Sequence, residues 1–233
     1  MKFIVEEKVF AVLPTACFGV VVARGIDNRS VDPRPAELLR QSIEALETKF
    51  AAAKAKESME IAPYRAAFGK LGINPNKFLS SIEAMASRIE KKKGFPSINP
   101  VVDLGNALSL KYLLPMGAHD IDAAGGDIQV RFSRQGDLFT PFGEEQAEVL
   151  EDGELIYSAG DRVKTRRWIW RQSEEGKVTE KSRNIFFPID GFTDGNLERV
   201  LCARDELAEM IRRIFGADVQ VGMADSKNPA MNV

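Results

Sequence analysis

The sequence predicts an α+β fold: a single domain in which a β-rich core of sandwich-like sheets is flanked by helices. Helical patterns dominate the first half of the chain, short β-patterned runs dominate the second, and no linker clearly divides them. The chain has 233 residues, 44% of them hydrophobic and 28% charged, which suits a globular protein with a sizeable core. We therefore predict one domain over residues 1–233, with a tail at 224–233 that lacks an apolar pattern and is expected to fray.

The amino-terminal third predicts strands followed by helices. Residues 3–5 and 9–12 are expected to form short strands, and the apolar, β-branched run at 17–23 is typical of a buried strand. Apolar residues then recur at three-, four- and seven-residue spacing, which predicts a helix over 33–56. A loop and short helix follow at 61–73. The pair Asn74-Pro75 is a helix start, with Asn as cap and Pro in the first turn.

A second such pair, Asn99-Pro100, starts an almost wholly apolar helix at 101–113. Three polar residues, Asp103, Asn106 and Ser109, lie near one edge of this helix. Buried polar groups need partners, because leaving one unpaired costs roughly 1–3 kcal/mol. The stripe is either an internal capping network or the wall of a ligand pocket, and the sequence leaves both open.

From residue 127 onward the chain becomes rich in β-patterned runs. Strands are expected at 128–132, 137–139, 154–157, 163–171 and 184–187. Thr193 is expected to cap a long final helix. Residues 218–222 are expected to form a closing strand.

The stretch from 162 to 172 gathers five cations and both tryptophans of the protein. On a continuous strand, Arg166, Trp168, Trp170 and Gln172 would share one face and Arg167 and Arg171 the other. Guanidinium groups match phosphates, and indole rings stack on bases. The stretch predicts contact with a polar, anionic ligand; the alternative is an exposed basic hairpin with its tryptophans in the core.

Composition limits the function classes. The net charge is −2 and the isoelectric point about 5.7, so any RNA contact must use a local basic patch. The charged amino terminus does not resemble a signal peptide, and no apolar run approaches the ~18–20 residues of a membrane span. Two distant cysteines and one histidine give no metal-ligand spacing. We expect a cytoplasmic protein with no membrane contact, no metal and no cofactor.

The residues alone do not single out a catalytic group. His119, next to Asp120, is a possible base, although a lone histidine is more often a hydrogen-bonded structural residue. Glu154, Asp161 and Asp190 are possible acids, but their spacing distinguishes none of them. No nucleophile motif is present. The residues therefore indicate a domain that binds a small polar or nucleotide-bearing ligand.

Four segments in order, 96–109, 115–122, 125–131 and 165–172, resemble the B-three/B-four editing module of the phenylalanyl-tRNA synthetase β subunit. The resemblance extends from about residue 33 to 222. It implies a role in translation quality control: the domain would accept the aminoacylated 3′ end of tRNA and hydrolyse a wrong ester. It also implies a metal-free pocket in which an oriented water attacks.

Two positions depart from the pattern of this module. Its pocket histidine corresponds to Gly117 here, whereas His119 replaces a phenylalanine. Its glutamate that recognises the tyrosine hydroxyl corresponds to Pro188. Because a site built on such a hydrogen bond discriminates strongly, its loss predicts an aminoacyl group other than tyrosine.

The leading hypothesis is an aminoacyl-tRNA deacylase acting in trans. Asn106 and His119 would line its pocket, three arginines would hold the acceptor-end phosphates, and Trp168 or Trp170 would stack on the ligand. The alternatives are a tRNA-binding module without catalysis and an amino-acid-binding protein that shares only the fold. The sequence indicates neither the amino acid nor the oligomeric state. The predicted binding residues are Asp103, Asn106, His119, Asp120, Arg166, Arg167, Trp168, Trp170, Arg171 and Asn184.

Overall fold

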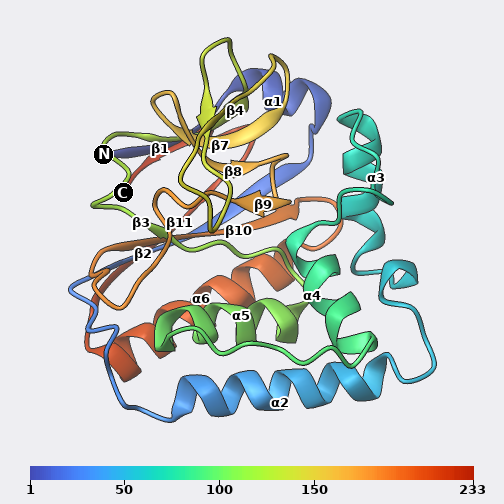
Figure 1. The fold of residues 1–233 in the computed structure, drawn as a ribbon, viewed down its shortest axis with the longest axis vertical. Helices are drawn as coiled ribbons and strands as arrows, with labels where there is room; N and C mark the ends of the chain where they lie inside the picture. The colour runs from blue at the N-terminus through green and yellow to red at the C-terminus, as the bar shows by residue number, and fades with distance from the viewer.

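The computed structural model describes residues 1–233 and confirms the α+β class, with two sheets above a layer of helices (Figure 1). The helices are α1 (Glu7–Val12), α2 (Arg34–Lys49), α3 (Ala62–Lys70), α4 (Ser81–Glu90), α5 (Pro100–Tyr112) and α6 (Leu197–Phe215), with a 3-10 turn at Ala55–Glu57. The strands are β1 (Lys2–Val5), β2 (Ala16–Arg24), β3 (His119–Asp120), β4 (Ile128–Phe132), β5 (Leu138–Phe139), β6 (Glu148–Val149), β7 (Leu155–Ala159), β8 (Arg162–Arg166), β9 (Arg171–Gln172), β10 (Ile185–Phe192), β11 (Asp218–Ala224) and β12 (Ala230–Asn232). None of the helices combines the length and the apolar composition that a membrane-spanning helix requires.

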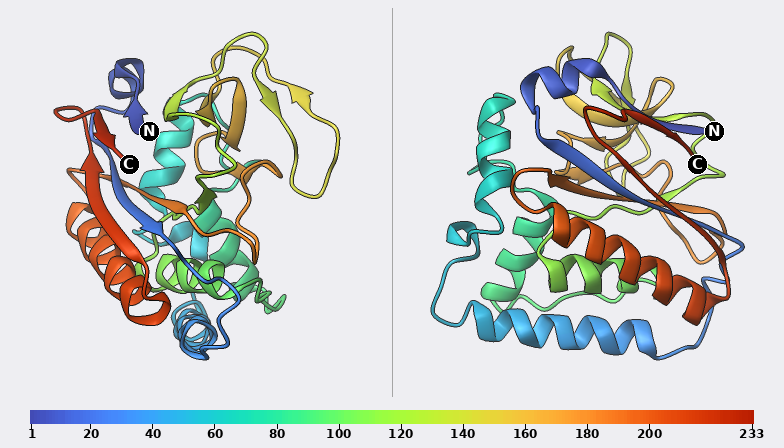
Figure 2. Two further views of the ribbon diagram at one scale, coloured as in Figure 1. Left: turned by 90° about the vertical axis from the view of Figure 1, so that its left-hand side faces the viewer. Right: turned by 180° about the vertical axis from the view of Figure 1, so that it is seen from behind.

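The smaller sheet lies in the middle of the molecule. Its strand order is β11-β2-β10-β3, and β2 pairs antiparallel with β10 along eight residues, from Ala16 opposite Phe192 to Ala23 opposite Ile185. Helix α6 covers one face of this sheet, with α5 beside it and α2 outside α5 (Figures 1 and 2). Both faces of β10 are therefore covered, and all its residues are buried.

The larger sheet covers the opposite face. Its order is β12-β1-β4-β7-β8-β5-β6, with β9 also paired to β8. Aromatic rings fill the space between the sheets: Phe3 packs against Phe18 at 5.9 Å and against Phe186 at 5.1 Å between ring centroids. A second apolar cluster, which includes Phe187 and Leu207, lies between the smaller sheet and the helices. Alternate residues of β10 thus face different cores, because side chains alternate across a strand.

Several predicted elements differ from the structure in type or at their ends. The predicted strand at 9–12 is the helix α1, and the predicted helix at 33–56 ends at Lys49. The start predicted at Asn74-Pro75 is a turn, and α4 begins after Ser80, whose Oγ accepts from the Glu83 amide at 3.4 Å. The final helix follows Asn196 rather than Thr193.

The carboxyl-terminal tail forms a strand, which corrects the expectation that it frays. Residues 230–232 pair antiparallel with β1, from Lys2 opposite Asn232 to Ile4 opposite Ala230. Val233 is buried, and its amide donates to the Met1 carbonyl at 3.1 Å. Backbone pairing at the open edge of the larger sheet orders a segment that lacks an apolar pattern.

We predict that Gly191→Ala lowers the free energy of unfolding by about 1–3 kcal/mol, because the added methyl group overpacks the contact between β10 and α6. A Cβ at Gly191 would collide with Val200 and lie 2.7 Å from Asn196 Oδ1. Gly195→Ala is the matched control, since its Cβ would meet no atom closer than 3.9 Å. Urea unfolding measures both variants, and equal stabilities would contradict the packing argument.

Candidate functional site

The basic stretch forms a hairpin rather than one continuous strand. Strand β8 ends at Arg166, β9 begins at Arg171, and these two residues pair opposite each other. Between them, Arg167 and Trp168 have φ angles of 48° and 60°, a left-handed conformation that costs roughly 1–3 kcal/mol for each non-glycine residue. The predicted alternation of faces along 163–171 is therefore wrong. The turn sends the Trp168 side chain into the space between the sheets.

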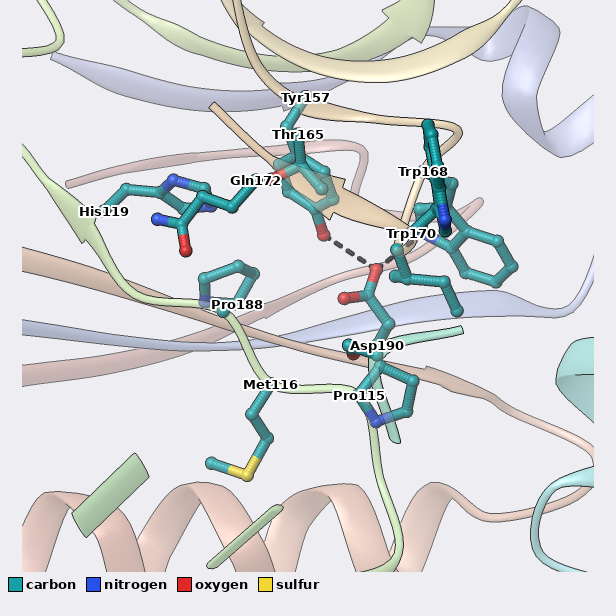
Figure 3. A pocket seen from close by; sticks show the side chains of 13 residues that line it. Pro115, Met116, His119, Tyr157, Thr165, Trp168, Trp170, Gln172, Pro188 and Asp190 are labelled. Carbon is teal, nitrogen blue, oxygen red and sulfur yellow. Dashed lines mark hydrogen bonds between the residues drawn. The ribbon is translucent and has the colours of Figure 1, made fainter. Parts of the chain in front are cut away.

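Trp168 reaches a carboxyl on β10 from this turn. Its Nε1–H donates to Asp190 Oδ1 at 2.6 Å, and the Tyr157 hydroxyl donates to the same oxygen at 2.7 Å (Figure 3). The backbone of Asp190 is also held, because its amide donates to Pro115 O at 3.0 Å and its carbonyl accepts from Tyr64 Oη at 2.9 Å. Four separate segments thus fix the position of this carboxyl.

Asp190 has an unusual proton affinity for an aspartate. Burial raises its pKa to about 7, although the hydrogen bonds from Tyr157 and Trp168 act in the opposite direction. The side chain is almost fully buried and forms no ion pair. At neutral pH the carboxyl is therefore present in both protonation states, which is the condition for an acid or base that works near pH 7.

A pocket opens beside Asp190 and encloses about 420 Å³, counting the space at its mouth. The strands β7, β8, β9 and β10, the loop before β3 and the start of α4 contribute its walls. A second pocket of about 550 Å³ adjoins it and shares Met116, Gly117 and Gln172 with it. The residues that line the first pocket are Ser81, Pro115, Met116, Gly117, His119, Tyr157, Thr165, Trp168, Ile169, Trp170, Gln172, Pro188 and Asp190.

His119 lines the first pocket as a neutral imidazole. Burial, together with the charge of Lys164, lowers its pKa to about 4. Its ring stacks on Tyr157 with centroids 5.9 Å apart, and its buried Nδ1 has no hydrogen-bond partner in the protein. Gly117 leaves room in front of Nε2, since a Cβ there would lie 3.2 Å from that nitrogen. The imidazole can therefore hydrogen-bond a ligand or a water.

The three residues of the polar stripe on α5 lie in different surroundings. Asp103 accepts from the Ile98 amide at 2.8 Å and Ser109 donates to Leu114 O at 2.6 Å, so these two residues hold the ends of the helix. Asn106 makes no side-chain hydrogen bond within the protein and lines the second pocket. Only Asn106 is thus available to a ligand.

Two further predicted residues hold loops together rather than line a pocket. Asp120 accepts from Ser182 Oγ and from the Asp122 amide, so it does not orient His119. Asn184 donates to Asp122 at 3.0 Å. Both side chains connect β3 and the residues after it to the segment that precedes β10.

Of the three predicted phosphate-binding arginines, two make close contacts within the protein and one is exposed and loosely paired. Arg166 pairs with Glu154 at 2.9 Å, and Arg167 lies over the Phe78 ring, 4.0 Å from its centroid. Neither lines the Asp190 pocket. Arg171 is exposed and only loosely paired, 4.0 Å from Glu144. The structure therefore brings His119, Trp168 and Trp170 together at the pocket and leaves Arg166 and Arg167 outside it.

Asp190 and Tyr157, which share a hydrogen bond at the pocket, are not among the predicted binding residues. Asp190 was only one of three possible acids. The sequence feature that could have distinguished Asp190 is its position as a charged residue inside an apolar strand. It lies two positions after Pro188, so both side chains lie on the same face of β10. Tyr157 carried no comparable signal.

Residues 63–216 match the family model of the B3/4 domain. The chain belongs to the B3/4 domain family. This membership confirms the resemblance noted in the sequence. In the structure, the pocket of this B3/4 domain lies within the matched segment.

Relatives of this B3/4 domain include phenylalanine–tRNA ligase β subunits. That of Idiomarina loihiensis is 33% identical over 96 residues, covering 41% of this chain and 12% of the relative. That of Geobacter metallireducens is 28% identical over 155 residues, covering 65% of this chain and 18% of the relative. The chain thus spans less than a fifth of these relatives. An N-terminal fragment of the Pyrococcus horikoshii phenylalanyl-tRNA synthetase β subunit superposes with a TM-score of 0.48 at 12% identity, covering 93% of this chain and 49% of the other.

We predict that Asp190 makes wild-type stability fall as the pH rises from 5 to 8. In the folded protein the Asp190 carboxyl keeps its proton up to about pH 7, whereas in the unfolded chain it releases the proton near its ordinary pKa of 3.8. The stabilisation from this proton is complete below that value and is lost as the pH rises through the folded pKa. Asp190→Asn carries no such proton. The free energy of unfolding of Asp190→Asn, taken relative to that of wild type, should therefore rise by on the order of 3 kcal/mol from pH 5 to pH 8.

Chemical denaturation at both pH values measures this gain. Asp194→Asn, an exposed residue on the loop after β10, is the control and should follow wild type. A constant difference between Asp190→Asn and wild type would show that the carboxyl does not titrate in this range.

Proposed function

We propose that this B3/4 domain is a hydrolase that removes a wrong amino acid from the 3′ end of tRNA. One observation carries the proposal: a pocket within the matched segment contains a buried carboxyl, Asp190, and a buried imidazole, His119. The names of its relatives point to tRNA as the partner, since they are phenylalanine–tRNA ligase subunits.

Ester hydrolysis needs a positioned water and little else from the protein. The water oxygen bonds to the ester carbonyl carbon, the bond from that carbon to the ribose oxygen breaks, and the ribose oxygen leaves with a proton. A nitrogen of neutral His119 can accept a hydrogen bond from the attacking water. Positioning of this kind fits a chain without a nucleophile motif.

The walls of the pocket favour one amino-acid side chain of moderate size. Met116, Trp170 and Pro188 form the apolar part of the walls. The first pocket adjoins the second pocket, which Asn106 lines. We propose that the aminoacyl group enters the first pocket and that the terminal ribose lies toward the second. Because Pro188 offers no hydrogen bond to a phenol, tyrosine is not the proposed substrate.

Contact with the acceptor-end phosphates is assigned chiefly to Arg171. The neighbouring Arg166 and Arg167 already have Glu154 as a partner, whereas Arg171 is exposed and 4.0 Å from its nearest carboxylate. Lys177, which lines the second pocket and pairs with Glu174, is the other cation near the proposed path of the ribose.

We predict selective loss of one aminoacyl ester when the purified protein meets a panel of correctly and wrongly charged tRNAs. His119→Ala and Asn106→Ala should each slow this loss at least about tenfold, because each removes a polar group that faces the substrate. Glu37→Ala, an exposed substitution on α2, is the control and should leave the rate unchanged.

Release of labelled amino acid over time measures the rate, and circular dichroism checks that each variant is folded. If no charged tRNA loses its amino acid, the hydrolase proposal fails. A steep fall of tRNA affinity with salt would then identify a binding module, because phosphate contacts release counterions. Unchanged rates in both variants would remove His119 and Asn106 from the site.

A further inference from the structure

One oxygen of the buried Asp190 carboxyl has no partner. Both side-chain donors, Tyr157 and Trp168, go to Oδ1, and no group of the protein donates to Oδ2. Figure 3 shows this second oxygen turned away from the two donors, on the side of Pro188 and His119. The residue is 2% exposed and lines the pocket, so what Oδ2 can meet is a molecule inside the pocket.

The pocket also lacks a positive charge to match this carboxylate. No lysine or arginine lines it, and His119 is neutral at physiological pH because burial lowers its pKa to about 4. Placing an unpaired carboxylate in such surroundings is costly. A cationic ligand would remove that cost by supplying the missing counterion.

The remaining walls suit a compact cation. The rings of Tyr157, Trp168 and Trp170 line the same pocket, and aromatic faces attract cations. The Thr165 hydroxyl and the Gln172 side chain contribute polar atoms, although the Gln172 amide nitrogen already donates to Ala118 O at 2.7 Å. An ammonium has three donors and can meet Oδ2 together with one of these acceptors.

We propose that this pocket binds a primary ammonium group, with Asp190 Oδ2 as its counterion and hydrogen-bond acceptor. Only the identity of that group, as the α-ammonium of an aminoacyl ester, rests on the proposed hydrolase function. An ester whose amino group is acylated loses both the charge and two donors. The site therefore selects free aminoacyl groups and rejects N-acylated ones.

Proton binding by Asp190 competes with ammonium binding. Because binding needs both the ionised carboxyl, whose pKa is about 7, and the protonated α-amino group of the probe, whose ordinary pKa is about 7.7–8.0, affinity should fall about fourfold between pH 8 and pH 6. The other groups around Asp190 stay neutral in this range. Burial raises the pKa of Cys17 to about 12 and those of Tyr64 and Tyr157 well above their usual values, while it lowers that of His119 to about 4.

The experiment follows the Trp168 indole N–H by NMR in the ¹⁵N-labelled full chain. Only two indole signals exist, and a Trp170→Phe sample assigns them. The probes are the amides of L-alanine, L-leucine and L-methionine and their N-acetyl counterparts, which carry no ester and no carboxylate. We expect the free amides to shift the Trp168 signal and the N-acetyl forms to bind at least about tenfold more weakly.

The matched variants are Asp190→Asn, which keeps the shape but loses the charge, and Asp194→Asn on the exposed loop after β10. The first should abolish the preference for the free amino group and the second should retain it. Equal affinity of wild type for free and acetylated amides would overturn the inference. So would an affinity independent of pH between 6 and 8, a measurement that needs no variant.

Failure of this inference is distinguishable from failure of the proposed function. Ammonium preference without deacylation of any charged tRNA would contradict the hydrolase and support the ammonium site. Deacylation that proceeds equally on N-acetyl-aminoacyl-tRNA, with KM unchanged in Asp190→Asn, would support the hydrolase and overturn the ammonium site.

Discussion

The Asp190 carboxyl joins elements that lie far apart along the chain. Its Oδ1 accepts from Tyr157 on β7 in the larger sheet and from Trp168 in the β8–β9 turn, while Asp190 itself belongs to the smaller sheet. These two hydrogen bonds cross the space between the sheets and fix their separation at this end. The pocket lies beside these polar contacts, whereas elsewhere aromatic rings such as Phe3 and Phe186 fill the space between the sheets.

This arrangement has a cost in stability that its surroundings offset. Arg167 and Trp168 take left-handed backbone conformations to turn the indole inward, and burial disfavours the charged form of Asp190. Buried packing of Trp168 against Tyr64 and Phe192 holds the turn in place. Strain and a shifted pKa at one location are typical of sites selected for function rather than for stability.

The pocket also separates two kinds of charge in the protein. The cations of the β8–β9 hairpin largely face glutamates on the outer side, as Arg166 does with Glu154, while the pocket contains a carboxyl without a cation. A ligand that enters the pocket therefore meets negative charge, and a ligand that approaches Arg171 meets positive charge. The proposed substrate, an aminoacylated acceptor end with an ammonium group at one end and phosphates at the other, would match this separation in sign.

The sequence by itself determined the α+β class, most strands and helices, the helix start at Asn99 and the family resemblance, because periodicity, capping and motif order are local properties. It also named His119 and both tryptophans. Only the tertiary structure decided that Trp168 points inward, that residues 230–232 form a strand, and that Asp190 differs from the other acids. Backbone turns, edge pairing and desolvation depend on neighbours distant in the chain, so no local pattern contains them.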